Sequence, residues 1–155
     1  MLQRIQTVWL FFATVSLFAL LLFPYVQVLN AYGTAKAIKV TGVYENLNGQ
    51  VVQTQPFLGL TIATVILGLI PFVIIFFYKD RKKQIALSYV AILLILGFSF
   101  WLVQTTKEVI GGVTLQLQNY GLGIILPSLG ILFIILALRG IRRDEKLIKS
   151  ADRLR

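Results

Sequence analysis

Four long apolar runs without an internal charge constrain this chain more than any other feature. They cover residues 5–23, 57–78, 85–103 and 120–138. A hydrocarbon layer about 30 Å thick needs roughly 20 apolar residues in a helix to cross it. Helices are the expected form because lipid offers no hydrogen-bond partner to a spanning backbone. The sequence therefore predicts an all-α membrane protein built on a four-transmembrane-helix bundle.

The composition agrees with this interpretation. Of the 155 residues, 57% are hydrophobic and only 14% are charged, whereas about 25% of residues are charged in an average soluble domain. The first run follows Arg4, as the apolar run of a signal peptide follows a basic start. It is longer than a usual signal-peptide core, however, and no small-x-small cleavage site follows it. We therefore expect the first run to be retained as an anchor.

The basic residues predict the orientation of the four spans. An even number of spans places both termini on one side, and short loops rich in Lys and Arg stay in the cytoplasm. Termini inside the cell would put 12 of the 15 basic residues on the cytoplasmic side. These are Arg4, Lys79, Arg81, Lys82, Lys83, Arg139, Arg142, Arg143, Lys146, Lys149, Arg153 and Arg155. We predict a multi-pass protein of the bacterial inner membrane with both termini cytoplasmic, and the net charge of +9 then requires no nucleic-acid partner.

The two outer loops, residues 24–56 and 104–119, contain β-strand patterns. Segments 36–44 and 50–54 are rich in β-branched residues and flank an Asn-Gly turn, which is typical of a hairpin. Segment 113–118 alternates apolar and polar residues, as a half-buried strand does. These patterns predict a small three-stranded extracytoplasmic β cap. The cap is either a lid over the helix ends or a binding surface for an outer partner.

The polar residues do not form a pattern typical of catalysis. The chain has no histidine and no cysteine, which removes the commonest metal ligand and general base as well as any thiolate. No metal-ligand spacing occurs, and no serine has a partner that would activate it. All six acids lie outside the spans: Glu45, Asp80, Glu108, Asp144, Glu145 and Asp152. We expect no enzyme activity, no cofactor and no metal.

Two prolines and a set of small residues mark the spans themselves. Pro71 and Pro127 lie at mid-span in the second and fourth runs, where a proline breaks the helical hydrogen-bond ladder. They predict either static kinks or the hinges of a small transporter. Small residues recur every seven positions in the fourth run, where they allow close helix packing inside the bundle or against a partner subunit. These residues are Gly123, Gly130 and Ala137.

Residues 141–155 predict an amphipathic helix with three stripes, either continuous with the fourth span or separated from it by Gly140. One stripe is basic: Arg142, Lys146, Lys149 and Arg153. The opposite stripe is apolar: Leu147, Ala151 and Leu154. Between them, three acids surround Ile148: Asp144, Glu145 and Asp152.

Three interpretations of this tail remain open. It docks on its own loops or on a partner protein, it lies on anionic lipid at about 1 kcal/mol per basic residue, or it is an inert flank. Docking on the same molecule predicts Asp144 or Asp152 within salt-bridge reach of Arg4 or of residues 79–84. RNA is a poor candidate, because no aromatic side chain accompanies the basic strip.

The start MLQRIQTVWL, the inner loop YKDRKKQIAL and the end LRGIRRDEKLIKSADRLR resemble a family of four-span inner-membrane proteins from Bacteroidota. The family is a domain of unknown function whose members begin M-x-Q-R-I-Q and end D-E-x-L-[VI]-[KR]-S-A-D-R-L-R. The resemblance is closest at the tail and covers the whole chain in layout. Because it has no assigned activity, the family implies an inner-membrane location and no mechanism.

Together these features predict a transmembrane domain over residues 1–140 and a cytoplasmic tail helix over residues 141–155. The predicted function is that of a non-catalytic accessory or scaffold subunit, with the lipid bilayer and a protein as partners and anionic lipid as a further one. The alternative is a small transporter or channel component with proline-broken helices, and no small-molecule ligand is indicated. The candidate interaction residues are Gln3, Arg4, Gln6, Arg81, Lys82, Lys83, Arg142, Arg143, Asp144, Glu145, Lys149, Asp152, Arg153 and Arg155.

Overall fold

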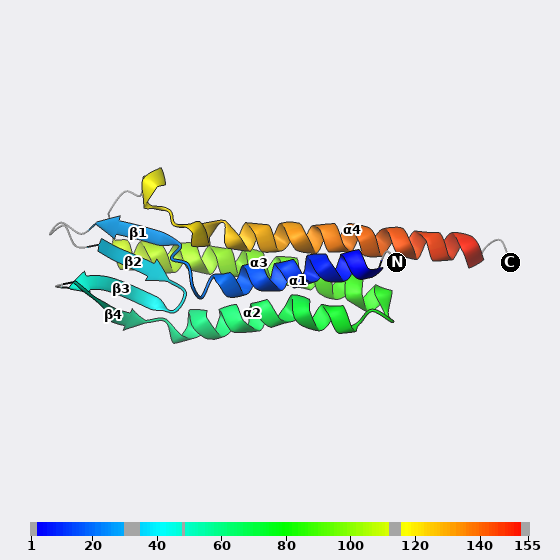
Figure 1. Ribbon diagram of the computed structural model, residues 1–155, viewed down its shortest axis with the longest axis horizontal. Coiled ribbons are helices and arrows are strands. Elements are labelled where there is room, and N and C mark those ends of the chain that lie inside the picture. The colour runs from blue at the N-terminus through cyan, green and yellow to red at the C-terminus, as the bar shows by residue number, and fades with distance from the viewer. Residues whose placement is uncertain (1–2, 30–34, 48, 112–115, 153–155) are drawn as a thin grey trace.

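The computed structural model describes residues 3–29, 35–47, 49–111 and 116–152. Four helices lie side by side along the length of the molecule, and a β-sheet lies at one end of them (Figure 1). The helices are α1 (Gln3–Ala19), α2 (Leu58–Phe76), α3 (Arg81–Ile110) and α4 (Leu126–Asp152). The strands are β1 (Val26–Leu29), β2 (Ala35–Lys39), β3 (Gly42–Leu47) and β4 (Gln50–Pro56). Two short 3₁₀ turns, η1 (Leu117–Asn119) and η2 (Leu122–Ile124), precede α4.

The four predicted apolar runs all contain helix, but not all are equally long. Among the described residues, three helices are long and apolar enough to cross a membrane: α2, α3 and the segment Leu122–Ile148. Helix α1 is shorter, with 17 residues, or about 25 Å at 1.5 Å per residue. It is apolar from Ile5 to Ala19. Three long apolar helices and one short apolar helix indicate an integral membrane protein.

The helices carry large apolar side chains on their outer surface as well as in their interior. Large apolar side chains are exposed on every helix, among them Phe11, Val15, Ile66, Leu93 and Leu132. Water would solvate such a surface poorly, whereas lipid tails are as apolar as these side chains. The exposure therefore suits a bundle that is surrounded by hydrocarbon.

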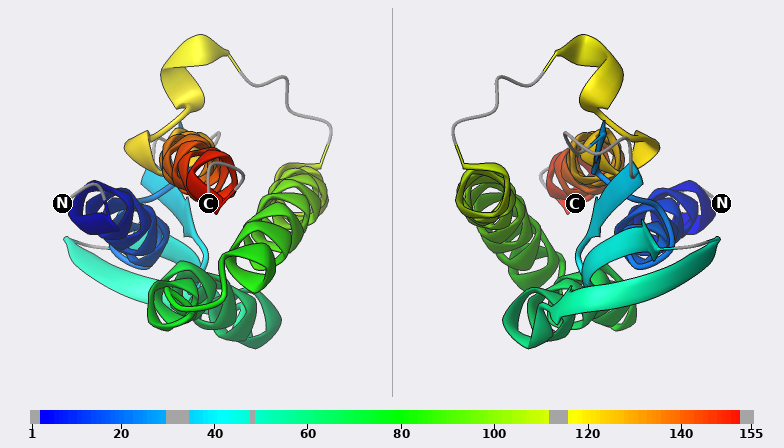
Figure 2. Two further views of the ribbon diagram at one scale, coloured as in Figure 1. Left: turned by 90° about the vertical axis from the view of Figure 1, so that its right-hand side faces the viewer. Right: turned by 90° about the vertical axis from the view of Figure 1, so that its left-hand side faces the viewer.

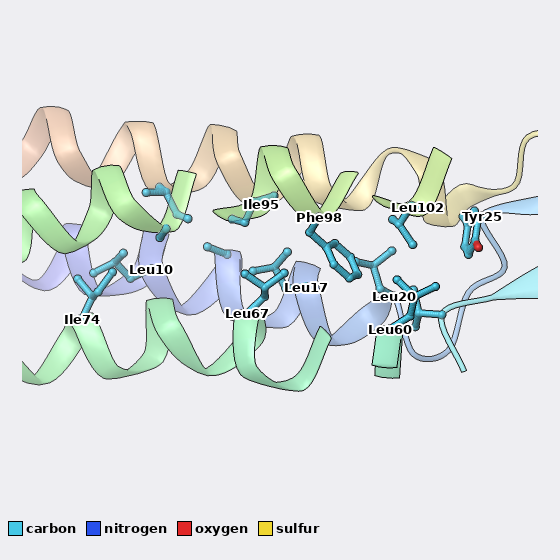
Figure 3. Packing of buried hydrophobic residues seen from close by; sticks show 14 of the residues in the cluster. Leu10, Leu17, Leu20, Tyr25, Leu60, Leu67, Ile74, Ile95, Phe98 and Leu102 are labelled. Carbon is cyan, nitrogen blue, oxygen red and sulfur yellow. The ribbon is translucent and has the colours of Figure 1, made fainter. Parts of the chain in front are cut away.

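The core of the bundle is formed where α1 packs on α2 and α4 and where α3 packs on the same two helices. Leu10, Leu17 and Leu67 point into this core from α1 and α2 (Figure 3). Gly130 of α4 lies against α1, since a Cβ atom there would be 3.3 Å from Leu17 Cγ. Ala137, two turns further along α4, is fully buried. The small residues of the fourth run therefore serve packing within the bundle.

The sheet has four strands instead of the predicted three, in the antiparallel order β1-β2-β3-β4. The predicted hairpin is present, with β3 paired to β4 and Gly49 at a φ of 83° in the turn. Segment 36–44 is not one strand, because the chain reverses between β2 and β3. Gly42 permits this reversal: its φ is 151°, and a Cβ atom there would overlap the Gln55 carbonyl. The additional strand, β1, comes from the segment directly after α1.

The predicted strand at residues 113–118 is wrong in its second half, and residues 113–115 lie outside the described part of the chain. Leu117–Asn119 forms the 3₁₀ turn η1, in which Asn119 Oδ1 accepts a hydrogen bond from the Gln116 amide at 2.9 Å. This turn covers the edge of β1. Asn119 Nδ2 donates to the Gln27 carbonyl at 3.1 Å, and Tyr120 forms a bridge with Val26.

Helix α4 is one continuous helix from Leu126 to Asp152, so Gly140 does not separate the tail from the span. Pro127 is its second residue and does not break the helix at mid-depth, which corrects the prediction for that proline. The first turn of a helix tolerates proline, because its amide would have no partner there. Pro71 does lie inside α2, where it is buried.

Tyr25 closes the core at the sheet end of the helices, just beyond the first apolar run (Figure 3). Its side chain is 2% exposed, and its hydroxyl is enclosed without a hydrogen-bond partner among the described residues. Burial raises the pKa of Tyr25 to about 12, and the neighbouring Thr106 hydroxyl offsets only part of that rise. The folded protein therefore holds this phenol proton more tightly than the unfolded chain does.

We expect the free energy of unfolding to fall as pH rises from about 10, the ordinary tyrosine pKa, to about 12. In that window Tyr25 ionises in the unfolded chain while it stays protonated in the fold, which costs roughly 2–3 kcal/mol. The Y25F variant lacks the ionisable hydroxyl, so its free energy of unfolding should not fall in this window. Unfolding in detergent, measured for both proteins from pH 8 to pH 12, should show a widening difference. Parallel curves would contradict the prediction.

Candidate functional site

The end of the bundle opposite the sheet carries most of the charge of the chain, and we call it the terminal end. It consists of the first turn of α1, the turn between α2 and α3, and α4 from Arg139 onward (Figure 1). Helix α4 extends past the start of α1 and past the α2–α3 turn (Figure 1). Most of the candidate residues identified in the sequence lie at this end.

Gln6 and Asp144 join α1 to the tail half of α4. Gln6 is 8% exposed, and its Nε2 donates a hydrogen bond to Asp144 Oδ2 at 2.6 Å. Gly140 allows this close approach, because a Cβ atom there would be 2.9 Å from Gln6 Cγ. An amide–carboxylate bond thus ties the root of the tail to α1, while α4 continues beyond the bundle (Figure 1). Asp144 was expected to meet Arg4 or residues 79–84, whereas the bond described here is to Gln6.

The turn between α2 and α3 is held by Asp80 and Gln84. Asp80 caps α3 by accepting from the Lys83 amide at 3.3 Å, and its carboxylate forms a salt bridge with Lys83 Nζ at 3.0 Å. The Lys83 hydrogen bonds hold the pKa of Asp80 below its ordinary value. Gln84 is buried and donates to the Ile74 carbonyl at 3.3 Å, which ties the start of α3 to the end of α2. This turn is a fixed structure, and Lys82 is exposed on it.

Helix α4 also contacts α3 at this end. The Arg142 guanidinium lies 5.2 Å from the centre of the Tyr89 ring, within the range of a cation–π contact. Arg81 differs from the other basic residues here, because its Nη1 is enclosed and has no hydrogen-bond partner among the described residues.

Two open hollows flank α4. The first, of about 750 Å³, lies between residues 78–82 and Glu145 and Ile148, and the second, of about 500 Å³, lies along Arg139–Lys146.

One face of α4 continues from the core to the exposed tip. Ile134, Ala137 and Ile141 are at most 1% exposed and pack into the bundle. Asp144 continues the same 3–4 spacing and meets Gln6. Ile148 comes next on this face, yet it is 46% exposed because α4 has passed the end of the bundle. Past Asp144, the inward face of α4 thus carries an apolar residue that the bundle leaves half-exposed.

The chain matches a protein family over almost its full length. Residues 2–154 match the model of a domain of unknown function, DUF4293. The chain belongs to the DUF4293 family. No curated protein matches it in sequence. The family match confirms the resemblance inferred from the sequence, in so far as that resemblance concerned a domain of unknown function.

Several hydroxyl side chains in the core of the DUF4293 bundle are bonded to the backbone of their own helices. The hydroxyls of Thr14, Thr64 and Ser88 are buried, and each donates to a carbonyl four residues earlier in its own helix. Leu67 and Ile74, about one turn before and after Pro71 on α2, are buried and apolar. No cluster of three or more His, Cys, Asp or Glu occurs in the described part of the chain.

The structure brings together some predicted residues of the DUF4293 terminal end and leaves others apart. Gln6 meets Asp144, while Arg81 and Lys82 line one hollow with Glu145. Arg143 lines the second hollow with Arg142. The side chains of Gln3, Arg4, Lys149 and Asp152, and all of Arg153 and Arg155, lie outside the described residues.

Sequence reasoning missed three residues that shape the terminal end. They are Gly140 as the contact for Gln6, Tyr89 under Arg142, and Gln84 in the α2–α3 turn. Gln84 could have been found from its position, because a glutamine at the end of an apolar run needs a partner once buried. Tyr89 and Gly140 follow no periodic pattern that would mark them.

Proposed function

We propose that this DUF4293 chain is a non-catalytic accessory or scaffold subunit of a protein complex in the inner membrane of a member of the Bacteroidota. In this proposal α1 is a fourth crossing, both termini are cytoplasmic, and the sheet is extracytoplasmic. The partner protein binds at the terminal end. Anionic lipid headgroups of the same leaflet contact the basic side chains on the outer sides of α4.

The observation that carries the proposal is the half-exposed continuation of the inward face of α4. Ile148 and the adjacent Leu147 are 46% and 53% exposed. Both stand at a level where the helix is flanked by basic residues and by the hollow beside residues 78–82. An apolar helix tip outside the lipid is stabilised when a second surface covers it. A partner with a small apolar patch and acidic neighbours fits these features.

The transporter alternative has less support. It requires a polar cavity at mid-depth between two broken helices. Pro127 lies in the first turn of α4, and the hydroxyls in the described core are bonded within their own helices. Core hydroxyls that are bonded within their own helices favour a structural role.

Cysteine labelling tests the proposed orientation, since the chain has no cysteine of its own. Ser150 on α4 and Gln53 on β4 are both exposed and offer sites at opposite ends of the molecule. In intact spheroplasts we expect a membrane-impermeant maleimide to label Q53C and to spare S150C until the membrane is opened. Labelling of S150C from outside would overturn the proposed orientation.

Site-specific photo-crosslinking tests the partner contact. A photoreactive residue at position 148 should give one discrete protein adduct in native membranes. The same residue at position 146 should give much less, because Lys146 lies about 200° around the helix from Ile148. The adduct should disappear when Leu147 is also replaced by aspartate. Equal adducts at both positions, or lipid adducts alone, would contradict a docking surface at the tip.

A further inference from the structure

A cavity of about 330 Å³ lies at the other end of the bundle, between α3 and the start of α4. The ribbon of α3 is inclined to the other helices, and its last turns stand apart from the start of α4 (Figure 2). The volume is within the range of about 300–1,000 Å³ found for ligand-binding pockets. Since its walls are membrane helices, the cavity opens beside the lipid.

The walls of the cavity are predominantly apolar. Leu102, Val103, Ile124 and Pro127 contribute aliphatic surface from both sides. Ser99 donates to the Ile95 carbonyl and Thr106 to the Leu102 carbonyl, each at 2.8 Å, whereas the Tyr25 hydroxyl in the same wall has no partner among the described residues. The cavity therefore suits a hydrocarbon chain better than a polar solute.

One end of the cavity is cationic. Lys107 lines it eight residues beyond Ser99, which is about 12 Å further along α3. It lies one turn past Val103, where the uncharged run of α3 ends. The other lysines described at the sheet end are engaged, with Lys36 in a 3.2 Å salt bridge to Glu45 and Lys39 over the Tyr44 ring. Lys107 has no salt bridge within the described residues.

We infer that this cavity holds an acyl chain of a membrane phospholipid whose phosphate contacts Lys107. The apolar section lies beside the hydrocarbon, and the lysine lies at the level where headgroups begin. Tyr120 at the rim is half-exposed, as interfacial aromatic side chains are. The ligand is thus an anionic phosphate group with a hydrocarbon tail, bound on the sheet side of the membrane.

Native mass spectrometry of the full chain tests this site, with phosphatidylglycerol and headgroup-free diacylglycerol as the probes. We expect one retained phosphatidylglycerol per chain, bound roughly fivefold more tightly than diacylglycerol, as about 1 kcal/mol per basic contact implies. K107A should lose that preference, and K39A should keep it. Lys107 is exposed, so K107A should fold normally.

A second pair of variants tests whether the cavity between α3 and α4 holds the acyl chain. Ser128 lines the cavity from α4, so S128F should fill it and abolish retention of both lipids. L129F, one residue along and outside the cavity, is the matched control and should bind both lipids normally. Folding of each variant is checked by circular dichroism. Equal retention of the two lipids by the wild type, or retention unchanged in S128F, would overturn the inference.

Discussion

Replacement of Leu17 by alanine is expected to destabilise the bundle by about 2–3 kcal/mol. Leu17 is fully buried near the end of α1, where it packs against Gly130 of α4. Deleting a buried leucine side chain in soluble proteins costs about 2–5 kcal/mol. The lower part of that range applies here, because lipid tails are as apolar as leucine and only the packing is lost. Gly130 opposite has no side chain with which to fill the cavity.

Unfolding from detergent micelles with a denaturing detergent measures this loss. Val15 is the matched control: it lies on the same helix but is 47% exposed toward the lipid. V15A should change the free energy of unfolding by a few tenths of a kcal/mol at most. Equal losses in L17A and V15A would show that α1 does not pack on α4 as described.

Replacement of Gly123 by alanine is expected to cost about 1–3 kcal/mol, the usual range for overpacking. A Cβ atom at Gly123 would lie 2.9 Å from three backbone atoms, the Phe23 carbonyl oxygen and the carbonyl carbon and oxygen of Pro24. Backbone atoms cannot move aside as a flexible side chain can. The Gly123 amide also donates to the Pro24 carbonyl at 3.0 Å, so the substitution strains the junction between α1 and α4.

The same substitution at Gly97 should raise the free energy of unfolding instead of lowering it. Gly97 lies inside α3, and no atom is within 4 Å of the position of its Cβ. Alanine there removes the conformational freedom of glycine in the unfolded chain, which stabilises a helix by up to about 1 kcal/mol. Measuring G123A and G97A under one set of conditions separates close packing from helix propensity. A loss of stability in G97A would contradict the open space described around it.

The sequence predicted the helices and the β3–β4 hairpin because each depends on local patterns. The apolar runs locate α2 to within two residues, whereas α3 begins four residues before its run and ends seven residues after it. Gly49 lies in the Asn-Gly turn that was expected. The start of α4 was harder to predict. Residues 120–125 are as apolar as the helix that follows, yet Gly121 and Gly123 pack on the chain near Pro24, and the segment forms the η2 turn instead.

The candidate site could be predicted only as a region. The distribution of charged residues predicted that the candidate interaction residues lie at one end of the bundle. The three stripes of the tail helix indicated that it contacts another surface. Gln6 and Asp144 are 138 positions apart, and no periodicity connects them. Their pairing depends on how α1 and α4 align along their length, which Leu17, Gly130 and Gly140 determine together. Such an alignment is a property of packing and leaves no trace in either segment alone.

The unbroken course of α4 has a mechanical consequence. Twelve residues from Ile141 to Asp152 form a stiff rod about 18 Å long at 1.5 Å per residue, rooted in the bundle by Ile141 and Asp144. Any load applied at its tip is carried directly into the buried helices, with no joint to absorb it. One residue inserted after Asp144 would rotate everything beyond it by about 100°, so the length of this rod sets the direction in which its tip faces.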